Sequence, residues 1–211
     1  MKVRWLNGPL KILAALLLAG VVLPVQAATI LVFGDSISAA YGLEANAGWV
    51  QLLQQKLDKN TAKKHRVING SLSGETTSGG VRRLPPLLAQ HRPDLVVLEL
   101  GGNDGLRGQP PKMMAANLRK MIADARAAGA DVILLGMRIP PNYGKAYTAA
   151  FENAFADVAR ETGVAFHPFF LDGVGGNPAL MQRDGIHPTA EAQARLLANT
   201  WPLIEKALAR R

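Results

Sequence analysis

The sequence predicts a single α/β domain built on a parallel β-sheet. Apolar runs at residues 29–33, 94–100 and 131–137 are continuous rather than alternating, which is typical of strands buried on both faces. Segments with apolar residues at helical spacing lie between these runs, as expected where helices connect parallel strands. The chain of 211 residues is 48% apolar and has no internal repeat or linker, so we expect one domain over residues 28–211.

The first half of the chain supplies two of the expected strands and two helices. Residues 29–33 and 66–69 are short apolar segments, each followed by glycine, and predict strands. Between them, residues 49–57 carry apolar side chains at helical spacing, which predicts an amphipathic helix. A weaker helix that contains Pro85 and Pro86 is expected before the third strand.

The second half continues the alternation of strands and helices. The run at residues 94–100 is the clearest buried strand, and residues 131–137 predict another. A last amphipathic helix is expected near the C-terminus, with a kink at Pro202. The other expected elements are a helix over residues 114–125, a loop at 140–144, a helix at 145–162, a brief strand at 164–166 and a long loop at 169–188.

Residues 1–27 have the organisation of an export signal. An N-terminal segment with three basic and no acidic residues precedes an apolar run over residues 12–23. This run is shorter than the ~20 residues needed to cross a bilayer, which disfavours the alternative of a transmembrane anchor. Ala27 suits a signal-peptidase site. We therefore expect cleavage after Ala27 and a mature chain in the periplasm or outside the cell.

Composition narrows the classes of function. The formal net charge of +8 falls to +5 once residues 1–27 are removed, and the remaining basic residues are scattered along the chain. Aromatic residues make up only 6% of the sequence, so the stacking platforms of nucleic-acid-binding proteins are not indicated. The lack of cysteine excludes thiol catalysis, thiolate metal sites and disulfides. We expect no nucleic-acid partner and at most peripheral contact with a membrane.

Four polar clusters lie beside the predicted strands and the last helix. In an open parallel sheet, the loops at the carboxyl ends of the strands share one edge. Clusters that are distant in the sequence are therefore expected to converge in space. They are residues 34–38 (GDSIS), 69–76 (NGSLSGET), 101–104 (GGND) and 184–188 (DGIHP).

These clusters contain the groups that acyl transfer by a serine requires. A serine hydroxyl is a weak nucleophile until a histidine takes its proton, and a carboxylate must fix the tautomer of that histidine. Ser36 can be the nucleophile, His187 the base and Asp184 the orienting acid. The backbone amides of Ser36 and Gly74 and the side-chain amide of Asn103 can form an oxyanion hole.

The four clusters resemble the signature blocks of the SGNH (GDSL-type) hydrolase superfamily and occur in the family's order. The resemblance is closest to the bacterial periplasmic thioesterase, arylesterase and lysophospholipase branch, where a loop like PPNYG at residues 140–144 also recurs. It implies a flavodoxin-like, three-layer α/β/α fold of about five parallel strands, with no metal or other cofactor. It also implies a catalytic triad of Ser36, Asp184 and His187, with Gly74 and Asn103 completing the oxyanion hole.

Each cluster taken singly has a structural explanation as a turn or a helix cap, and only their combination favours catalysis. Asp172 is a competing candidate for the acid, but Asp184 shares the loop of His187. Glu99 falls in a strand expected to be buried, so we interpret it as structural. The remaining histidines lack a serine or carboxylate pattern and are interpreted as surface or structural residues: His65, His91 and His167.

The sequence therefore predicts a serine esterase that cleaves aryl or alkyl esters through an acyl-enzyme on Ser36. Thioesters and lysophospholipids are further candidate substrates. A polysaccharide O-deacetylase is the alternative enzyme, although few aromatic residues are available for sugar stacking, and a non-catalytic solute-binding protein is the alternative outside enzymes. We expect a monomer whose partner is a small-molecule or lipid ester. Its acyl chain is expected to contact Leu106, Ile139, Pro140 and Tyr143.

Overall fold

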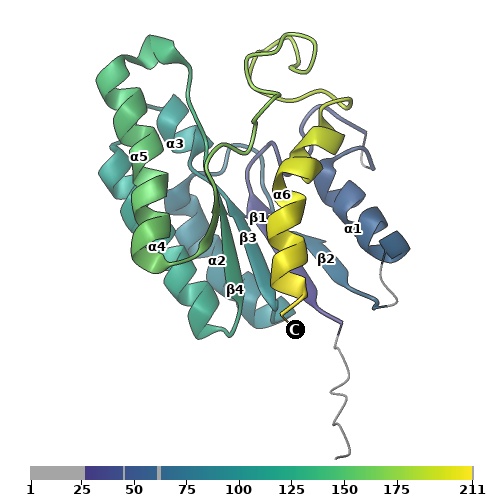
Figure 1. Ribbon diagram of the computed structural model, residues 1–211. Coiled ribbons are helices and arrows are strands. Elements are labelled where there is room, and N and C mark those ends of the chain that lie inside the picture. Colours follow the sequence, from purple (N-terminus) through teal and green to yellow (C-terminus); the bar gives the residue numbers. More distant parts are fainter. Residues whose placement is uncertain (1–26, 45, 61–62, 211) are drawn as a thin grey trace, which may run out of the picture.

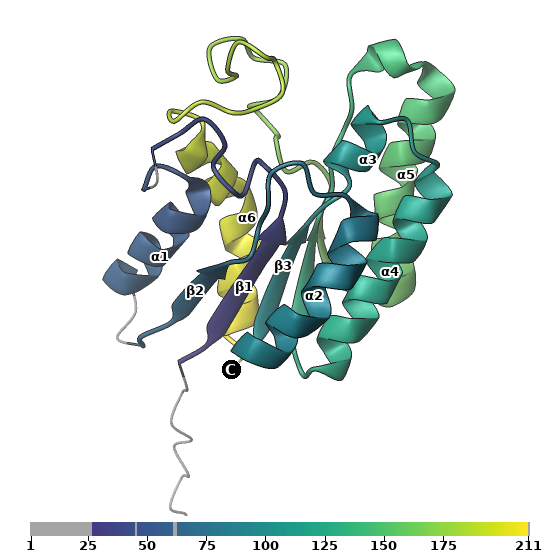
Figure 2. The ribbon, with the colours of Figure 1, turned by 180° about the vertical axis from the view of Figure 1, so that it is seen from behind.

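The structure is a computed structural model that describes residues 27–44, 46–60 and 63–210; apart from Ala27, the predicted export signal lies outside them. A five-stranded sheet forms its centre, with helices on both faces (Figures 1 and 2). All neighbouring strands are parallel, in the order β2-β1-β3-β4-β5. The predicted α/β class with about five parallel strands is therefore confirmed. The strands are β1 (Thr29–Gly34), β2 (Arg66–Asn69), β3 (Leu95–Glu99), β4 (Asp131–Leu135) and β5 (Ala165–His167).

The helices divide between the two faces of the sheet, which makes the fold three-layered. Two of them, α1 and α6, pack together on one face, while α2, α4 and α5 cover the other (Figures 1 and 2). None of the described helices is long and apolar enough to cross a membrane. The helices are α1 (Trp49–Asn60), α2 (Thr77–His91), α3 (Gly102–Leu106), α4 (Pro111–Ala127), α5 (Lys145–Thr162) and α6 (Gln193–Leu208).

The central strands are buried because helices cover both of their faces. Every residue of β3 is buried, and so are the last five of the six residues of β1. On the α1 and α6 face, Trp49 is fully buried, and its backbone N–H donates to the side-chain oxygen of Gln193 at 3.0 Å. Its indole ring packs edge-on against Phe170, with ring centroids 5.3 Å apart. Burial of each such large apolar side chain contributes about 2–3 kcal/mol.

The expected elements differ from the observed ones mainly at their ends. The helix predicted over residues 145–162 has the expected bounds, whereas the strand predicted at 131–137 ends at Leu135. At Gly136, a side chain would collide with the backbone of Pro168. The backbone N–H of Gly136 donates to the carbonyl of His167. The short helix α3 was not predicted, because five residues show no helical periodicity.

Two helices continue through their prolines. Helix α2 contains Pro85 and Pro86, and α6 continues through Pro202, where the sequence predicts a kink. The ends of α2 are well defined, since the Thr76 side chain accepts from the N–H of Gly79 and Arg92 closes the helix in a left-handed conformation. The N-terminus of α2 is thereby fixed beside the carboxyl edge of the sheet.

Candidate active site

The turn after β1 holds Ser36 at the carboxyl edge of the sheet. Strand β1 lies between β2 and β3, so its end is flanked by the loops that follow both neighbours. From the β2 side, the Ser71 hydroxyl accepts from the N–H of Gly34 at 3.0 Å. From β3, the fully buried Glu99 accepts from the Ser38 hydroxyl at 2.7 Å and from the N–H of Asp35 at 3.3 Å. Side chains from both neighbouring segments therefore fix the conformation of this turn.

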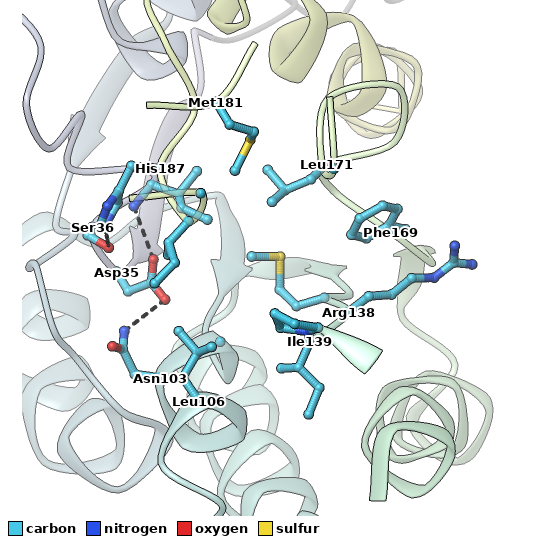
Figure 3. Close-up of a pocket in the computed structure, with 18 of the residues that line it drawn as sticks. Asp35, Ser36, Asn103, Leu106, Arg138, Ile139, Phe169, Leu171, Met181 and His187 are labelled. Carbon is cyan, nitrogen blue, oxygen red and sulfur yellow. Dashed lines mark hydrogen bonds between the residues drawn. The ribbon is translucent and has the colours of Figure 1, made fainter. Parts of the chain in front are cut away.

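Ser36, His187 and Asp184 form one chain of hydrogen bonds, of which Figure 3 shows the contact between Ser36 and His187. The Ser36 Oγ lies 2.8 Å from the His187 Nε2, and the His187 Nδ1 lies 2.6 Å from the Asp184 Oδ2. Both distances are within the range of good hydrogen bonds. The structure thus brings together the serine, the imidazole and the carboxylate that the sequence singles out. The competing candidate, Asp172, instead faces Arg195 at 3.8 Å.

The loop that carries the histidine is ordered by its own hydrogen bonds. The Asp184 Oδ1 accepts from the backbone N–H groups of Ile186 at 2.9 Å and of His187 at 3.0 Å. The carbonyl of His187 accepts from the N–H of Gln182 at 2.7 Å. The ring of Tyr41 packs on the imidazole with centroids 4.6 Å apart, a contact that no pattern in the sequence indicates.

The tautomer of His187 follows from the state of Asp184. Hydrogen bonds from the backbone N–H and the side chain of His187 lower the pKa of Asp184 to about 2, so this carboxyl is ionised at neutral pH. An ionised carboxylate can only accept hydrogen bonds, so the His187 Nδ1 must carry a proton. The Nε2 of the neutral ring is then free to accept from the Ser36 hydroxyl, which is the arrangement a general base requires.

Hydrogen bonds connect the loop that carries Gly74 with the helix α3, which carries Asn103. The buried carboxylate of Asp104 accepts from the backbone N–H of Thr77 at 2.8 Å and from its hydroxyl at 2.5 Å. The Arg107 guanidinium also donates to the carbonyl of Gly74 at 3.0 Å. Gly74 has φ +78°, a backbone conformation that favours glycine. These contacts hold both candidate oxyanion donors on a common framework.

Asp35 is a site residue that the sequence did not single out. Its Oδ2 accepts from the Asn103 side-chain amide at 3.1 Å, and its Oδ1 accepts from the N–H of Ile37 at 3.1 Å (Figure 3). The residue is only 2% exposed, and this burial raises its pKa from 3.8 to about 6. The hydrogen bond from the N–H of Ile37 acts in the opposite direction and favours the carboxylate. The residue lies within the GDS segment, but only the three-dimensional structure places it against Asn103.

The raised pKa of Asp35 predicts a pH-dependent effect of Asp35→Asn on stability. The folded chain holds the Asp35 proton more tightly than the unfolded chain does, so this group lowers the free energy of unfolding as the pH rises from about 4 to about 6. The full effect is of the order of 2–3 kcal/mol. The variant lacks this group, so its stability relative to wild type should rise by that amount between about pH 4 and pH 7.

Urea unfolding of both proteins at several pH values measures this difference directly. Groups whose ionisation Asp35 does not influence contribute equally and cancel in the comparison, whereas Glu99, whose pKa the Asp35 charge also raises, titrates differently in the two proteins. A stability difference that stays constant between pH 4 and pH 7 would contradict the raised pKa of Asp35.

A largely apolar cavity of about 530 Å³ opens beside Ser36 and His187 (Figure 3). Three of the four residues expected to contact an acyl chain line it, namely Leu106, Ile139 and Pro140. Tyr143 is not among the lining residues; its hydroxyl donates to the carbonyl of Leu106 at 2.8 Å. The sequence did not indicate the remaining apolar lining residues, most of which lie in the irregular segment after β5: Ile37, Met137, Pro141, Phe169, Leu171, Met181 and Ile186.

Arg138, the basic residue on the wall of the cavity apart from His187, already contacts neighbouring side chains. Arg138 pairs with Glu152 at 3.2 Å, and its guanidinium lies 4.7 Å from the centre of the Phe169 ring. Within the described part of the chain, no cluster of three or more His, Asp or Glu residues could hold a metal ion.

Comparisons with known proteins agree with this geometry. Residues 32–195 match the model of the GDSL-like lipase/acylhydrolase family. The chain is 53% identical over 200 residues to the esterase TesA of Pseudomonas aeruginosa, covering 92% of this chain and 99% of that protein. It is 45% identical over 165 residues to thioesterase 1/protease 1/lysophospholipase L1 of Escherichia coli, covering 78% and 77%. The crystal structure of the psychrotrophic esterase EstA from Pseudoalteromonas, inhibited by monoethylphosphonate, superposes with TM-score 0.81 at 42% identity, covering 86% and 98%.

Proposed function

The chain belongs to the GDSL-like lipase/acylhydrolase family, and from this premise we propose that it hydrolyses carboxylic esters with Ser36 as the nucleophile. The observation that carries the proposal is the hydrogen-bond chain from the Ser36 Oγ through His187 to Asp184, with distances of 2.8 and 2.6 Å. Related proteins named as esterases support the same reaction class.

The proposed reaction has two steps that use the same groups. The Ser36 Oγ attacks the acyl carbon while the His187 Nε2 takes its proton, and the ionised Asp184 stabilises the imidazolium that forms. The oxyanion accepts hydrogen bonds from the N–H groups of Ser36 and Gly74 and from the Asn103 amide. His187 then protonates the leaving oxygen or sulfur, which leaves an acyl-enzyme. Water attacks this ester with His187 again as the base. The bond between the Ser36 Oγ and the acyl carbon then breaks as His187 returns the proton to the Oγ, and the carboxylic acid is released.

We assign the acyl group of the substrate to the apolar cavity beside Ser36. Its walls of leucine, isoleucine, methionine and phenylalanine suit a hydrocarbon chain better than a sugar, which disfavours a polysaccharide deacetylase. The names of the relatives include arylesterase, thioesterase and lysophospholipase, so aryl esters, acyl thioesters and lysophospholipids are the proposed substrate classes. The bond that breaks differs among them, but the attack on the acyl carbon is the same.

Labelling with an alkyl fluorophosphonate tests the nucleophile. We expect a single adduct on Ser36, in which the Oγ–P bond forms, the P–F bond breaks and fluoride leaves as His187 takes the serine proton. The labelled peptide also contains Ser38, so fragmentation must locate the adduct between the two serines. Adduct formation at any other residue would refute the proposed role of Ser36. A chain-length series of p-nitrophenyl esters, with one acyl-CoA and one lysophospholipid, then ranks the substrate classes.

We further propose that residues 1–27 are an export signal cleaved after Ala27 and that the mature enzyme is a periplasmic or secreted monomer. Ala27 is exposed whereas Ala28 is buried, which supports a boundary of the folded domain at this point. The mature protein then acts on small-molecule or lipid esters outside the cytoplasm, with at most peripheral contact with a membrane.

A further inference from the structure

Asp35 is a buried carboxylate beside the nucleophile that the proposed reaction does not use. Removing a carboxylate from water is unfavourable unless hydrogen bonds replace those of the solvent. The carboxylate of Asp35 accepts one hydrogen bond on each oxygen, from the N–H of Ile37 and from the side chain of Asn103. Asn103 is the only side chain among the three proposed oxyanion donors, so it is also the only one whose orientation the backbone does not fix.

We propose that Asp35 is a positioning residue that orients the Asn103 amide so that its NH₂ group, and not its oxygen, faces the oxyanion. This inference rests on the proposed function. The NH₂ and oxygen of an asparagine amide have nearly the same shape, so packing alone hardly distinguishes the two orientations. A carboxylate accepts but cannot donate, and therefore only the amide nitrogen of Asn103 can lie against Asp35. One N–H is used in this contact, and the second N–H of the same nitrogen remains for the oxyanion. The flipped amide would bring its oxygen against the carboxylate.

The neighbouring acids are engaged elsewhere, which leaves this role to Asp35. Glu99 lies on the other side of Asp35, where it accepts from the Asp35 backbone N–H and from the Ser38 hydroxyl. Asp104 is adjacent to Asn103 in the sequence, but both of its oxygens accept from Thr77. The Asn103 amide thus donates its hydrogen bond to Asp35, in the segment that also carries the nucleophile.

The Asp35→Asn variant tests the inference by separating kcat from KM. The new side chain has one oxygen, which cannot replace both carboxylate oxygens, and its NH₂ group favours the flipped amide of Asn103. Loss of a whole oxyanion donor typically costs ~10²–10³ in kcat, which sets the upper limit. We expect kcat to fall about 10–100-fold while KM stays within a factor of about three, because the contact matters only as the oxyanion forms. The matched control is Asp58→Asn, the same change at an exposed position on α1, which should leave both constants unchanged.

A double-mutant cycle with Asn103→Ala gives the decisive readout. If Asp35 acts through the Asn103 amide, Asp35→Asn should have almost no further effect on kcat once that amide is absent. A merely structural role would instead lower kcat by the same factor in both backgrounds, and that outcome would overturn the inference. If Asp35→Asn does not fold, Asp35→Ser takes its place in the same cycle, with folding checked by circular dichroism.

Failure of this inference can be told apart from failure of the proposed function. Fluorophosphonate labelling of the wild-type enzyme reports on Ser36 without any change at Asp35. Labelling at Ser36 together with additive effects in the cycle would reject only the positioning role of Asp35.

Discussion

Replacing Ser36 with alanine is expected to lower kcat for ester hydrolysis by roughly 10⁴–10⁶ while the protein remains folded. The substitution removes the attacking oxygen but leaves the oxyanion donors and the apolar cavity in place, so substrate binding should change little. The Ser36 Oγ is hydrogen-bonded to the His187 Nε2, and loss of this bond should alter the free energy of unfolding by only about 1 kcal/mol. Single-turnover and steady-state kinetics with a p-nitrophenyl ester measure the effect.

The matched control for this substitution is Ser78→Ala. Ser78 is an exposed serine on α2, and its hydroxyl accepts a hydrogen bond from the guanidinium of Arg82. Full activity is expected for this control. If Ser36→Ala retained more than about a tenth of wild-type activity with an unchanged unfolding temperature, Ser36 could not be the nucleophile.

Asp184→Asn is expected to lower kcat about 10⁴-fold, because it changes the tautomer of the base rather than the position of the loop. The asparagine oxygen can still accept from the backbone N–H groups of Ile186 and His187, so the loop should keep its conformation. The NH₂ group of the new side chain, however, would donate to the His187 Nδ1. The ring proton would then lie on the Nε2, which could no longer accept from the Ser36 hydroxyl.

Asp172→Asn is the control for this second prediction, since Asp172 is the other candidate for the acid. Its side chain is exposed and faces Arg195, and the substitution should change kcat less than about twofold. The opposite pattern, with an active Asp184→Asn and an inactive Asp172→Asn, would assign the orienting role to Asp172. Proton NMR of the His187 ring in both variants would identify the tautomer directly.

Much of the fold and the polar part of the site could be predicted because they follow from the hydrophobic pattern of strands and helices and from the geometry of parallel sheets. Continuous apolar runs located β1, β3 and β4, and the spacing of apolar residues located α1 and α4. The expected bounds of α5 were also correct. The rule that the loops after parallel strands share one edge then predicted that Ser36 and His187 lie close together. This inference needed only the order of the elements along the chain.

The unpredicted features depend on irregular segments, which carry no periodic signal. The segment after β5 supplies several walls of the cavity, including Leu171 and Met181, through a path that no spacing of apolar residues indicates. The packing of Tyr41 on His187 and the hydrogen bond between Asp35 and Asn103 each join two segments that are distant in the sequence. Such contacts depend on the exact course of both backbones. Tyr143 shows the same limit, because it lies in the expected loop but contacts Leu106 through its hydroxyl instead of lining the cavity.

The wide separation of the catalytic groups along the chain has a consequence for biosynthesis. Ser36 and His187 are 151 positions apart, yet they lie within one hydrogen bond of each other. A ribosome-bound intermediate that ends before the last loop carries the nucleophile without its base and therefore cannot cleave esters by this route. Ester hydrolysis by these groups therefore requires that the chain be synthesised at least as far as His187 and that the loop carrying this residue has folded against Ser36.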